Sequence, residues 1–326
     1  MSRPSPVARA VDSLLDRSVV LGYTRLGSAV RRAWWPADPP PGALRGRVVA
    51  VTGANSGLGK ATALGAARLG AEVWMLCRDT TRGESARADI LDAVPGAALR
   101  VLRCDVSDLD ALPAVAARLR AEAPRLHALV HNAGVLPPHR SESPQGHELT
   151  YATHVLGPHL LTHELRDLLA ADGDARVVFV TSGGMYTAGL DLDDPELTHT
   201  AYSGTRAYAH TKRMQVHLAE EWARRLAPDR VAVHSTHPGW AGTPGLAGSL
   251  PGFNRLVGPL LRSAEAGADT TVWLLAAPEG GSTTGLLWHD RAPRPTAYLS
   301  RTRPTPDQVR RLWDLVVAAT GVPAAS

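Results

Sequence analysis

"RVVAVTGANSGLG", residues 47–59, joins a run of β-branched residues to a glycine-rich turn. The valines are typical of a buried strand, and a helical pattern follows the last glycine. Glycines at such a turn allow the backbone to approach a pyrophosphate, which the N-terminus of the following helix binds. The turn therefore predicts a dinucleotide site formed by Gly53, Asn55, Ser56, Gly57, Leu58 and Gly59. A glycine-rich turn without a ligand is the alternative.

Strand-like and helical stretches alternate through the rest of the chain. Short apolar runs begin near residues 72, 99, 126, 176 and 230, and helices are expected over about 81–94, 107–122 and 205–227, with a long helical region ending at Ala171. This alternation predicts an α/β fold, a single-domain, Rossmann-like, doubly wound parallel sheet with helices on both faces. The proline-rich stretch "WWPADPPPG" separates an N-terminal helical arm and linker (1–43) from this domain (44–326).

The charge of the chain is uneven. The formal net charge is +4, and residues 1–35 carry six Arg against two Asp, so the other 291 residues sum to zero. The domain therefore offers no basic field for nucleic acid, and no nucleic-acid partner is expected. Cys77 and Cys104 are too few for a disulfide framework and are expected as buried thiols. Without an uncharged span or a signal-peptide pattern, a cytoplasmic protein is expected.

The end of the second strand bears on the choice of cofactor. In dinucleotide-binding folds an acidic residue there binds the ribose hydroxyls, whereas an Arg accommodates a 2′-phosphate. Arg78 follows the strand, and its forked guanidinium suits a phosphate, so NADP(H) is preferred. Asp79 turned inward would favour NAD(H) instead. Asp105 and its neighbour Val106 are expected at the adenine edge, and Asn132, Ala133 and Gly134 beside the cofactor.

Tyr208 and Lys212 are the candidate acid/base pair. The chain has thirty-three arginines but two lysines, Lys60 and Lys212. Four residues apart on a helix, Tyr208 and Lys212 share a face. Bringing a phenol to neutral pH needs a shift of about three pKa units, or ~4 kcal/mol, and a cation about 4 Å away in a partly shielded site supplies ~4 kcal/mol. We therefore expect Lys212 to lower the pKa of Tyr208; Tyr202, four residues before Arg206, is the competing phenol.

The set "TGANSGLG", "NAG", "VTS", "YAHTK" and "HPGWAGT" resembles the short-chain dehydrogenase/reductase family. The segments "TSGGMY" and "KRMQVHLAEEWA" are similar to the branch of dehydrogenase/reductase member 12 and, more distantly, of the retinol dehydrogenase-type enzymes. The resemblance implies that Tyr208 exchanges the proton with Lys212 as its partner, and that Ser182 hydrogen-bonds the substrate oxygen. It also implies a nicotinamide site lined by Pro238, Gly239 and Thr243.

One position departs from the family pattern. An Asn that holds a water of the proton relay is usual where this chain has His154, in "HVLG". Imidazole both donates and accepts hydrogen bonds, so His154 is a further candidate catalytic residue. Two functions follow: an oxidoreductase that interconverts an alcohol and a carbonyl, or a cofactor-binding sensor or scaffold without turnover.

The remaining expectations concern partners. Met185, Trp240, Leu246, Phe253 and Leu256 suggest a pocket for an apolar small molecule. His159 and His163 lie one turn apart but lack a third ligand, so no metal is expected. The Arg-rich arm either lies on an anionic membrane or packs against the domain or a partner subunit. A homo-oligomer formed through the long helices is possible, and the arm could block it.

Overall fold

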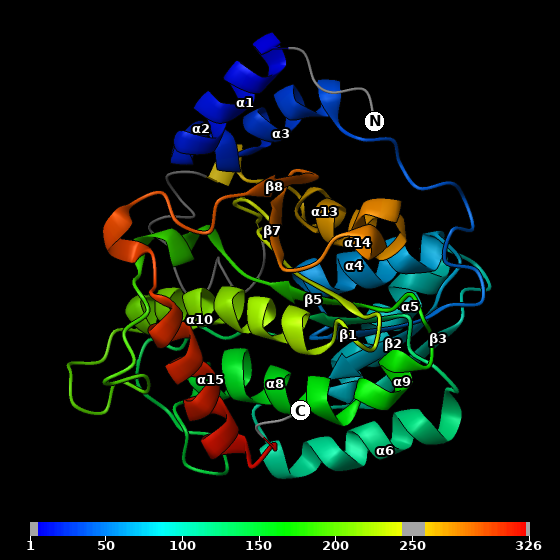
Figure 1. The fold of residues 1–326 in the computed structure, drawn as a ribbon. Helices are drawn as coiled ribbons and strands as arrows, with labels where there is room; N and C mark the ends of the chain where they lie inside the picture. Colours follow the sequence, from blue (N-terminus) through cyan, green and yellow to red (C-terminus); the bar gives the residue numbers. More distant parts are fainter. Residues whose placement is uncertain (1–5, 243–257, 324–326) are drawn as a thin grey trace.

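The computed structural model describes residues 6–242 and 258–323, and eight strands within these ranges form one sheet (Figure 1). Their order is β3-β2-β1-β4-β5-β6-β7-β8, and all neighbours are parallel except β7 and β8. The predicted fold class is confirmed. Strand order reverses between β1 and β4, where sheets of this kind bind ligands at the carboxyl ends. The strands are β1 (Val48–Thr52), β2 (Glu72–Cys77), β3 (Leu99–Arg103), β4 (Ala128–His131), β5 (Arg176–Val180), β6 (Ala232–Thr236), β7 (Leu286–His289) and β8 (Ala292–Arg294).

Helices cover both faces of the sheet because the strands are apolar on both sides. Successive strand residues point to opposite faces, so Ala50 packs in one core layer, whereas Val49 and Val51 pack in the other. Burial of these layers from water is the main stabilising contribution. One layer is covered by α4 (Gly57–Arg68), α5 (Thr80–Ala93) and α13 (Ala264–Ala276), which α14 (Pro278–Ser282) follows, and the other by α6 (Leu112–Glu122), α8 (Gly157–Glu164), α10 (Gly204–Arg225) and α15 (Pro306–Thr320).

The long helical region expected before Ala171 is divided into segments. The chain forms α7 (Leu149–Tyr151), a π-helical turn η3 (Ala152–Leu156), α8 and α9 (Arg166–Ala170). A π turn widens the helix and often occurs at functional sites. Here it carries His154, which is completely buried.

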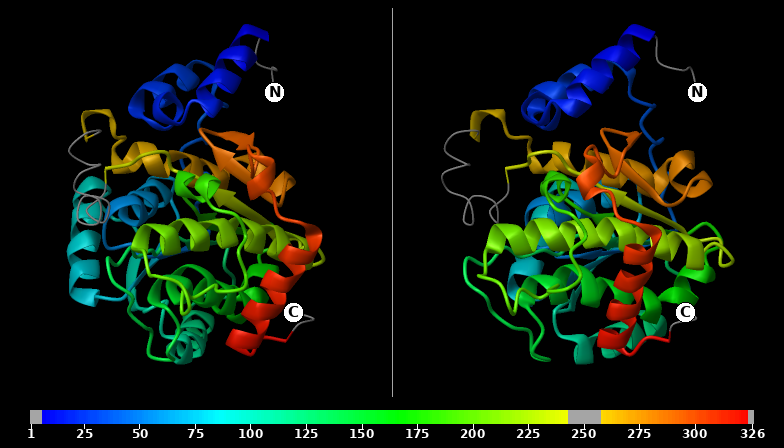
Figure 2. Two further views of the ribbon diagram at one scale, coloured as in Figure 1. Left: turned by 90° about the vertical axis from the view of Figure 1, so that its left-hand side faces the viewer. Right: turned by 60° about the vertical axis from the view of Figure 1, so that its left-hand side comes forward.

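The C-terminal part extends the sheet and covers the long helices. β7 and β8 form the far edge of the sheet, and α15 crosses α10 and α8 (Figures 1 and 2). Trp313 of α15 packs its ring 5.1 Å from Trp222 of α10 and 4.8 Å from His159 of α8. His159 is therefore a core residue. Among the described residues, α15 is the element that packs over these helices.

The N-terminal arm is three short helices docked on the domain. They are α1 (Pro6–Arg17), α2 (Val19–Tyr23) and α3 (Arg25–Arg31). The first break occurs at Ser18, whose side chain caps α2, and the second at Thr24. Tyr23 and Arg31 are almost completely buried, so the arm is packed against the domain. Short 3-10 turns complete the described elements: η1 (Arg32–Trp34), η2 (Leu109–Ala111), η4 (Gly183–Thr187), η5 (Gly258–Leu260) and η6 (Ser300–Thr302).

Candidate active site

The glycine-rich turn is a tight turn at the carboxyl end of β1, packed closely against the segment after β4. Gly53 and Gly57 have positive φ angles of 66° and 52°, which favour glycine. A Cβ on Gly59 would lie 2.3 Å from the Gly53 carbonyl oxygen and 2.4 Å from Asn132 Nδ2, so only glycine lets the start of α4 pack this closely against the turn. Asn55, Ser56 and Leu58 are half-buried along it. The turn therefore has the shape that a pyrophosphate at the start of α4 requires.

The ends of β1 and β4 are tied together. Thr52 Oγ1 accepts hydrogen bonds from the backbone N–H groups of Asn132 (2.9 Å) and Ala133 (3.0 Å), and Asn132 Nδ2 donates to Thr52 O (3.0 Å). These bonds hold the predicted "NAG" segment beside the glycine-rich turn. Gly134 is exposed at its tip.

The residues after β2 and β3 are those on which the two cofactor hypotheses depend. Arg78 is exposed at the end of β2. Asp79 accepts a hydrogen bond from the backbone N–H of Arg82 (3.1 Å) and so caps α5. Its Oδ1 is engaged as this cap, and the residue is exposed at the start of α5. After β3, Asp105 is half-buried and its Oδ1 accepts hydrogen bonds from both the N–H and the hydroxyl of Ser107, while Val106 is buried.

His154 uses both ring nitrogens within the protein. The backbone N–H of Val135 donates to His154 Nε2 (3.0 Å), so the proton of the neutral ring lies on Nδ1 and is donated to Thr211 Oγ1 (2.8 Å). Burial, helped by the nearby charge of Lys212, holds the pKa of His154 well below its usual value. The imidazole is therefore neutral, and in this arrangement neither nitrogen is free to hold a relay water.

Tyr208 lies between His154 and Ser182. Its ring centroid is 5.3 Å from that of His154. Ser182 follows β5, and its Oγ accepts a hydrogen bond from the backbone N–H of Gly184 (3.3 Å). Burial raises the pKa of Tyr208, and a hydrogen bond with Ser182 offsets part of that rise. The lowered pKa expected from the sequence is thus wrong for this structure, because burial outweighs the stabilisation of the phenolate.

Lys212 lies under the ring of Tyr208 in a buried position. Its Nζ is 5.5 Å from the ring centroid and donates to Val180 O (2.8 Å) and Gln215 Oε1 (2.9 Å). Burial lowers the pKa of Lys212 to about 7. A Cβ on Gly134 would lie 3.1 Å from His154 Nε2 and 3.8 Å from Lys212 Nζ, so these groups converge behind the "NAG" segment.

The other wall of the site comes from the segment after β6. Gly239 has a φ of 73°, and a Cβ there would lie 2.7 Å from the Tyr23 carbonyl oxygen of the arm. A Cβ on Gly267 of α13 would contact Leu58 Cδ2 at 2.7 Å and Pro238 Cβ at 3.6 Å, so Pro238 lies on the side of the glycine-rich turn. Thr243 lies outside the described residues.

These features agree with the comparison to known proteins. The family model for the short chain dehydrogenase matches residues 47–250. The chain belongs to the short-chain dehydrogenase/reductase family. It is 38% identical over 273 residues to dehydrogenase/reductase SDR family member 12 of Bos taurus, covering 83% of this chain and 85% of that protein. It is 32% identical to retinol dehydrogenase 12 of Homo sapiens, covering 86% and 88%. The branch predicted from the sequence is confirmed.

Solved structures share the fold of this short-chain dehydrogenase/reductase. An uncharacterized protein from Mycobacterium paratuberculosis superposes with a TM-score of 0.70 at 26% identity, over 88% of this chain and 97% of that chain. A Shigella flexneri protein complexed with NADP has a TM-score of 0.63 at 22% identity, over 78% of this chain and all of that one. Members of the family bind NAD(H) or NADP(H).

Two residues of this short-chain dehydrogenase/reductase site escaped the sequence analysis. Gln215 is buried and holds the Lys212 ammonium. Tyr23 of the arm packs edge-on against His237, with centroids 4.4 Å apart, and its carbonyl accepts a hydrogen bond from Trp240 N (2.8 Å). Gln215 lies one turn after Lys212 on the same helix, so its spacing was a usable sign that the two side chains meet. The residues around Tyr23 contain no motif that indicates its place near the site.

The predicted apolar pocket is partly revised. Met185 is completely buried against Val216 and Leu287, so it is a core residue and not a pocket wall. Trp240 is half-buried beside the site. Leu246, Phe253 and Leu256 lie outside the described residues.

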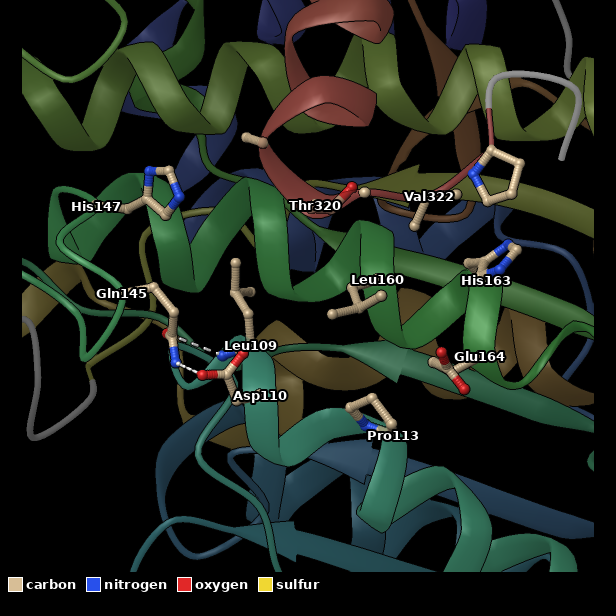
Figure 3. Close-up of a pocket in the computed structure, with 13 residues that line it drawn as sticks. Leu109, Asp110, Pro113, Gln145, His147, Leu160, His163, Glu164, Thr320 and Val322 are labelled. Atoms are coloured by element: carbon tan, nitrogen blue, oxygen red, sulfur yellow. Dashed lines mark hydrogen bonds between the residues drawn. The ribbon is translucent and has the colours of Figure 1, made fainter.

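A cavity of about 410 Å³ lies away from these groups, at the C-terminal end of α15 (Figure 3). Gln145 points into it but is held there by Leu109 N and by the Asp108 and Asp110 carboxylates. This cavity includes none of the predicted site residues.

Proposed function

We propose that this protein is an NADP(H)-dependent oxidoreductase that interconverts an alcohol and a carbonyl on an apolar small molecule. The observation that carries the proposal is the grouping of Ser182, Tyr208 and Lys212 beside Gly134. A hydroxyl, a phenol and an ammonium there adjoin the carboxyl ends of β1 and β4. Such a grouping suits proton transfer to or from a substrate oxygen.

The residues present fit a dinucleotide. The turn from Gly53 to Gly59 packs too closely for a side chain at Gly59, and its backbone would hold the pyrophosphate at the N-terminus of α4. Arg78 would bind the 2′-phosphate, because its guanidinium is exposed and Asp79 is engaged as a helix cap. When bound, the nicotinamide supplies or accepts a hydride.

The chain's own groups would handle the proton. With its pKa raised by burial, Tyr208 keeps its proton at neutral pH, so its hydroxyl is ready to donate to a carbonyl oxygen. Ser182 would hold the same oxygen, as its hydrogen bond with Tyr208 brings the two hydroxyls together. Lys212, fixed by Val180 O and Gln215 Oε1, would stabilise the phenolate left after proton donation.

The proposed substrate class is apolar. The relative named retinol dehydrogenase acts, by its name, on an apolar alcohol. Trp240, half-buried next to Gly239, supplies an aromatic surface beside the proposed nicotinamide site.

A cofactor-binding sensor without turnover is the second candidate. The feature that favours it is His154, whose two ring nitrogens are engaged by Val135 and Thr211 where the family pattern has a water-holding Asn. A blocked relay would slow the return of the proton to Tyr208.

Incubation with NADPH and a panel of apolar aldehydes and ketones separates the two candidates. The oxidoreductase consumes NADPH with at least one carbonyl, and replacing Ser182 by Ala reduces that rate. Measurable NADPH binding with no consumption across the panel would support the sensor and contradict the enzyme.

A further inference from the structure

The arm is attached to the domain by its polar face. Arg31, completely buried, donates to Asp12 Oδ1 (2.7 Å) and to Asp290 Oδ2 (2.9 Å). Arg294 donates to both oxygens of Asp12 (2.7 and 3.0 Å), and Asp16 accepts a hydrogen bond from Tyr298. Both acidic residues of the arm are therefore directed inward and engaged with the domain.

Six aliphatic side chains of the arm face outward. Among the described residues, eight large hydrophobic residues are exposed, and six of them lie in α1–α3 with 36% to 73% of their surface accessible. Isolated exposed apolar residues are ordinary, but a cluster marks an interaction surface. This cluster, here termed the aliphatic ridge, consists of Val7, Val11, Leu14, Leu21, Leu26 and Val30.

The charge beside the aliphatic ridge is positive. Arg9, Arg17, Arg25 and Arg32 are exposed on the same short helices. In the described part of the chain, Arg9, Arg17 and Arg25 form no ion pair with a carboxylate. Because Asp12 and Asp16 are engaged inward, the outer side combines exposed aliphatic groups with uncompensated cations.

We propose that the aliphatic ridge docks this protein on an anionic lipid surface. A helical segment with apolar side chains and arginines on its free side lies in the headgroup region, where the apolar groups leave water and the cations meet lipid phosphates. No helix in the described ranges is long and apolar enough to cross a bilayer, so the contact is with one leaflet. A second copy fits the ridge less well, because four arginines on each copy would face each other.

The docked surface lies next to the candidate active site. Tyr23, between the ridge residues Leu21 and Leu26, contacts His237 and Trp240. When the arm is docked, the segments around Pro238 and Gly239 therefore lie next to the lipid surface. An apolar substrate dissolved in the lipid would be close to them. The docking itself does not depend on the proposed activity, because it is measured without turnover.

Flotation of the whole protein with vesicles tests the proposal. Vesicles of phosphatidylcholine with about one third phosphatidylserine are compared with pure phosphatidylcholine, at low salt (about 50 mM) and high salt (about 500 mM). The protein is expected to float with the anionic vesicles and to float less at high salt. Failure to float with anionic vesicles at low salt would overturn the proposal.

Two double variants distinguish an effect of the aliphatic ridge on lipid binding from an effect of net charge alone. Leu14→Glu with Leu21→Glu places acids on exposed ridge positions and should reduce binding at least tenfold, an order-of-magnitude expectation. Ala114→Glu with Ala117→Glu adds the same charge at exposed positions of α6, at the opposite end of the molecule, and should float like the wild type (Figure 2).

Two further outcomes would contradict the docking proposal. Equal flotation of the two double variants would mean that the ridge does not bind the lipid. A dimer in light scattering that the ridge variant dissolves, with no flotation of the wild type, would assign the ridge to a second copy. Circular dichroism of each variant verifies that it is folded.

Discussion

Lys212 is held where burial opposes its charge. Its ammonium has two protein acceptors, Val180 O and Gln215 Oε1, and its pKa is lowered to about 7. In the unfolded chain the same group keeps its proton up to about pH 10.4. The folded protein thus gives up stability at this residue to hold a compact cation beneath Tyr208, a position that a planar guanidinium fits poorly.

The stability of the protein should therefore rise with pH above neutrality. Between about pH 7 and pH 8.5 the unfolded state holds the Lys212 proton and the folded state releases it, so the free energy of unfolding rises by ~1–2 kcal/mol. Urea unfolding at both pH values measures this rise. It should be missing in Lys212→Met and retained in Lys60→Met, the other lysine, which is paired with Asp89 at the surface. An equal rise in all three proteins would show that Lys212 is not the group responsible.

Arg78 should set the preference for NADPH. Arg78→Ala is expected to weaken NADPH binding by roughly 10- to 100-fold, because a charge-assisted phosphate contact of ~1.5–3 kcal/mol is lost. NADH binding should change little. Titration of both cofactors measures the change, with Arg68→Ala, an exposed arginine at the far end of α4, as the control. Parallel losses for NADPH and NADH would argue against a 2′-phosphate contact.

The arm helices are attached to the domain through buried ion pairs as well as through the packing of Tyr23. Arg31 and Arg262 both pair with Asp290, which is 3% exposed. Arg262 also donates to the backbone oxygens of Gly22 (3.0 Å) and Tyr23 (3.0 Å). These bonds replace water for most of the buried guanidinium nitrogens; Arg31 Nη2 has no hydrogen bond, and the Asp16 carboxylate lies 3.7 Å from it.

Removing Arg31 should loosen this attachment. Arg31→Met is expected to lower the free energy of unfolding by about 3 kcal/mol, since it removes one of the two arginine donors of both Asp12 and Asp290 and the buried bond to Gly22 O. Arg17→Met, at an exposed arginine of α1, should change it by at most ~0.5 kcal/mol. Urea unfolding compares the two variants with the wild type. Similar stabilities for both would show that the buried network does not anchor the arm.

Local sequence patterns were enough to predict most of the core elements. EVWMLC is the strand β2, and α5 and α10 begin within a residue of the expected 81 and 205. These segments combine apolar periodicity with clear ends, such as the cap at Asp79. β7 and β8 were not predicted. β7 has only four residues, and β8 (Ala292–Arg294) is a three-residue strand with a central proline, so neither shows a clear alternation of apolar and polar residues. The π turn at His154 does not alter the spacing of apolar residues in the sequence, so it was not predicted either.

The candidate site likewise has parts that the sequence predicted and parts that it did not. The glycine-rich turn and the pair Tyr208 and Lys212 are close in sequence, so their spacing carried the information. Tyr23 reaches His237 from more than two hundred positions away, and only the tertiary fold brings them together. The direction of the Tyr208 pKa shift also depends on burial, which a two-residue estimate of charge attraction omits.

At the scale of the whole molecule, the arm and the candidate site share the carboxyl edge of the sheet. The glycine-rich turn, the segment at Gly134, Ser182 and the start of α10 lie along that edge, and the arm closes over the segment at Gly239. The other end, with α6 and the cavity of Figure 3, takes no part. This arrangement places the proposed cofactor site, the proposed proton donor and the surface proposed to meet lipid at one edge of the sheet.

The reduction rate of Tyr208→Phe tests the central claim most directly. The variant keeps the ring against His154 and Lys212 but lacks the hydroxyl, so NADPH binding, measured by thermal shift, should remain. Its kcat/KM for NADPH-dependent carbonyl reduction should fall by ~10²–10⁴-fold, the usual contribution of a positioned acid. A variant that binds NADPH and reduces carbonyls at the wild-type rate would contradict the assignment of Tyr208 as the proton donor.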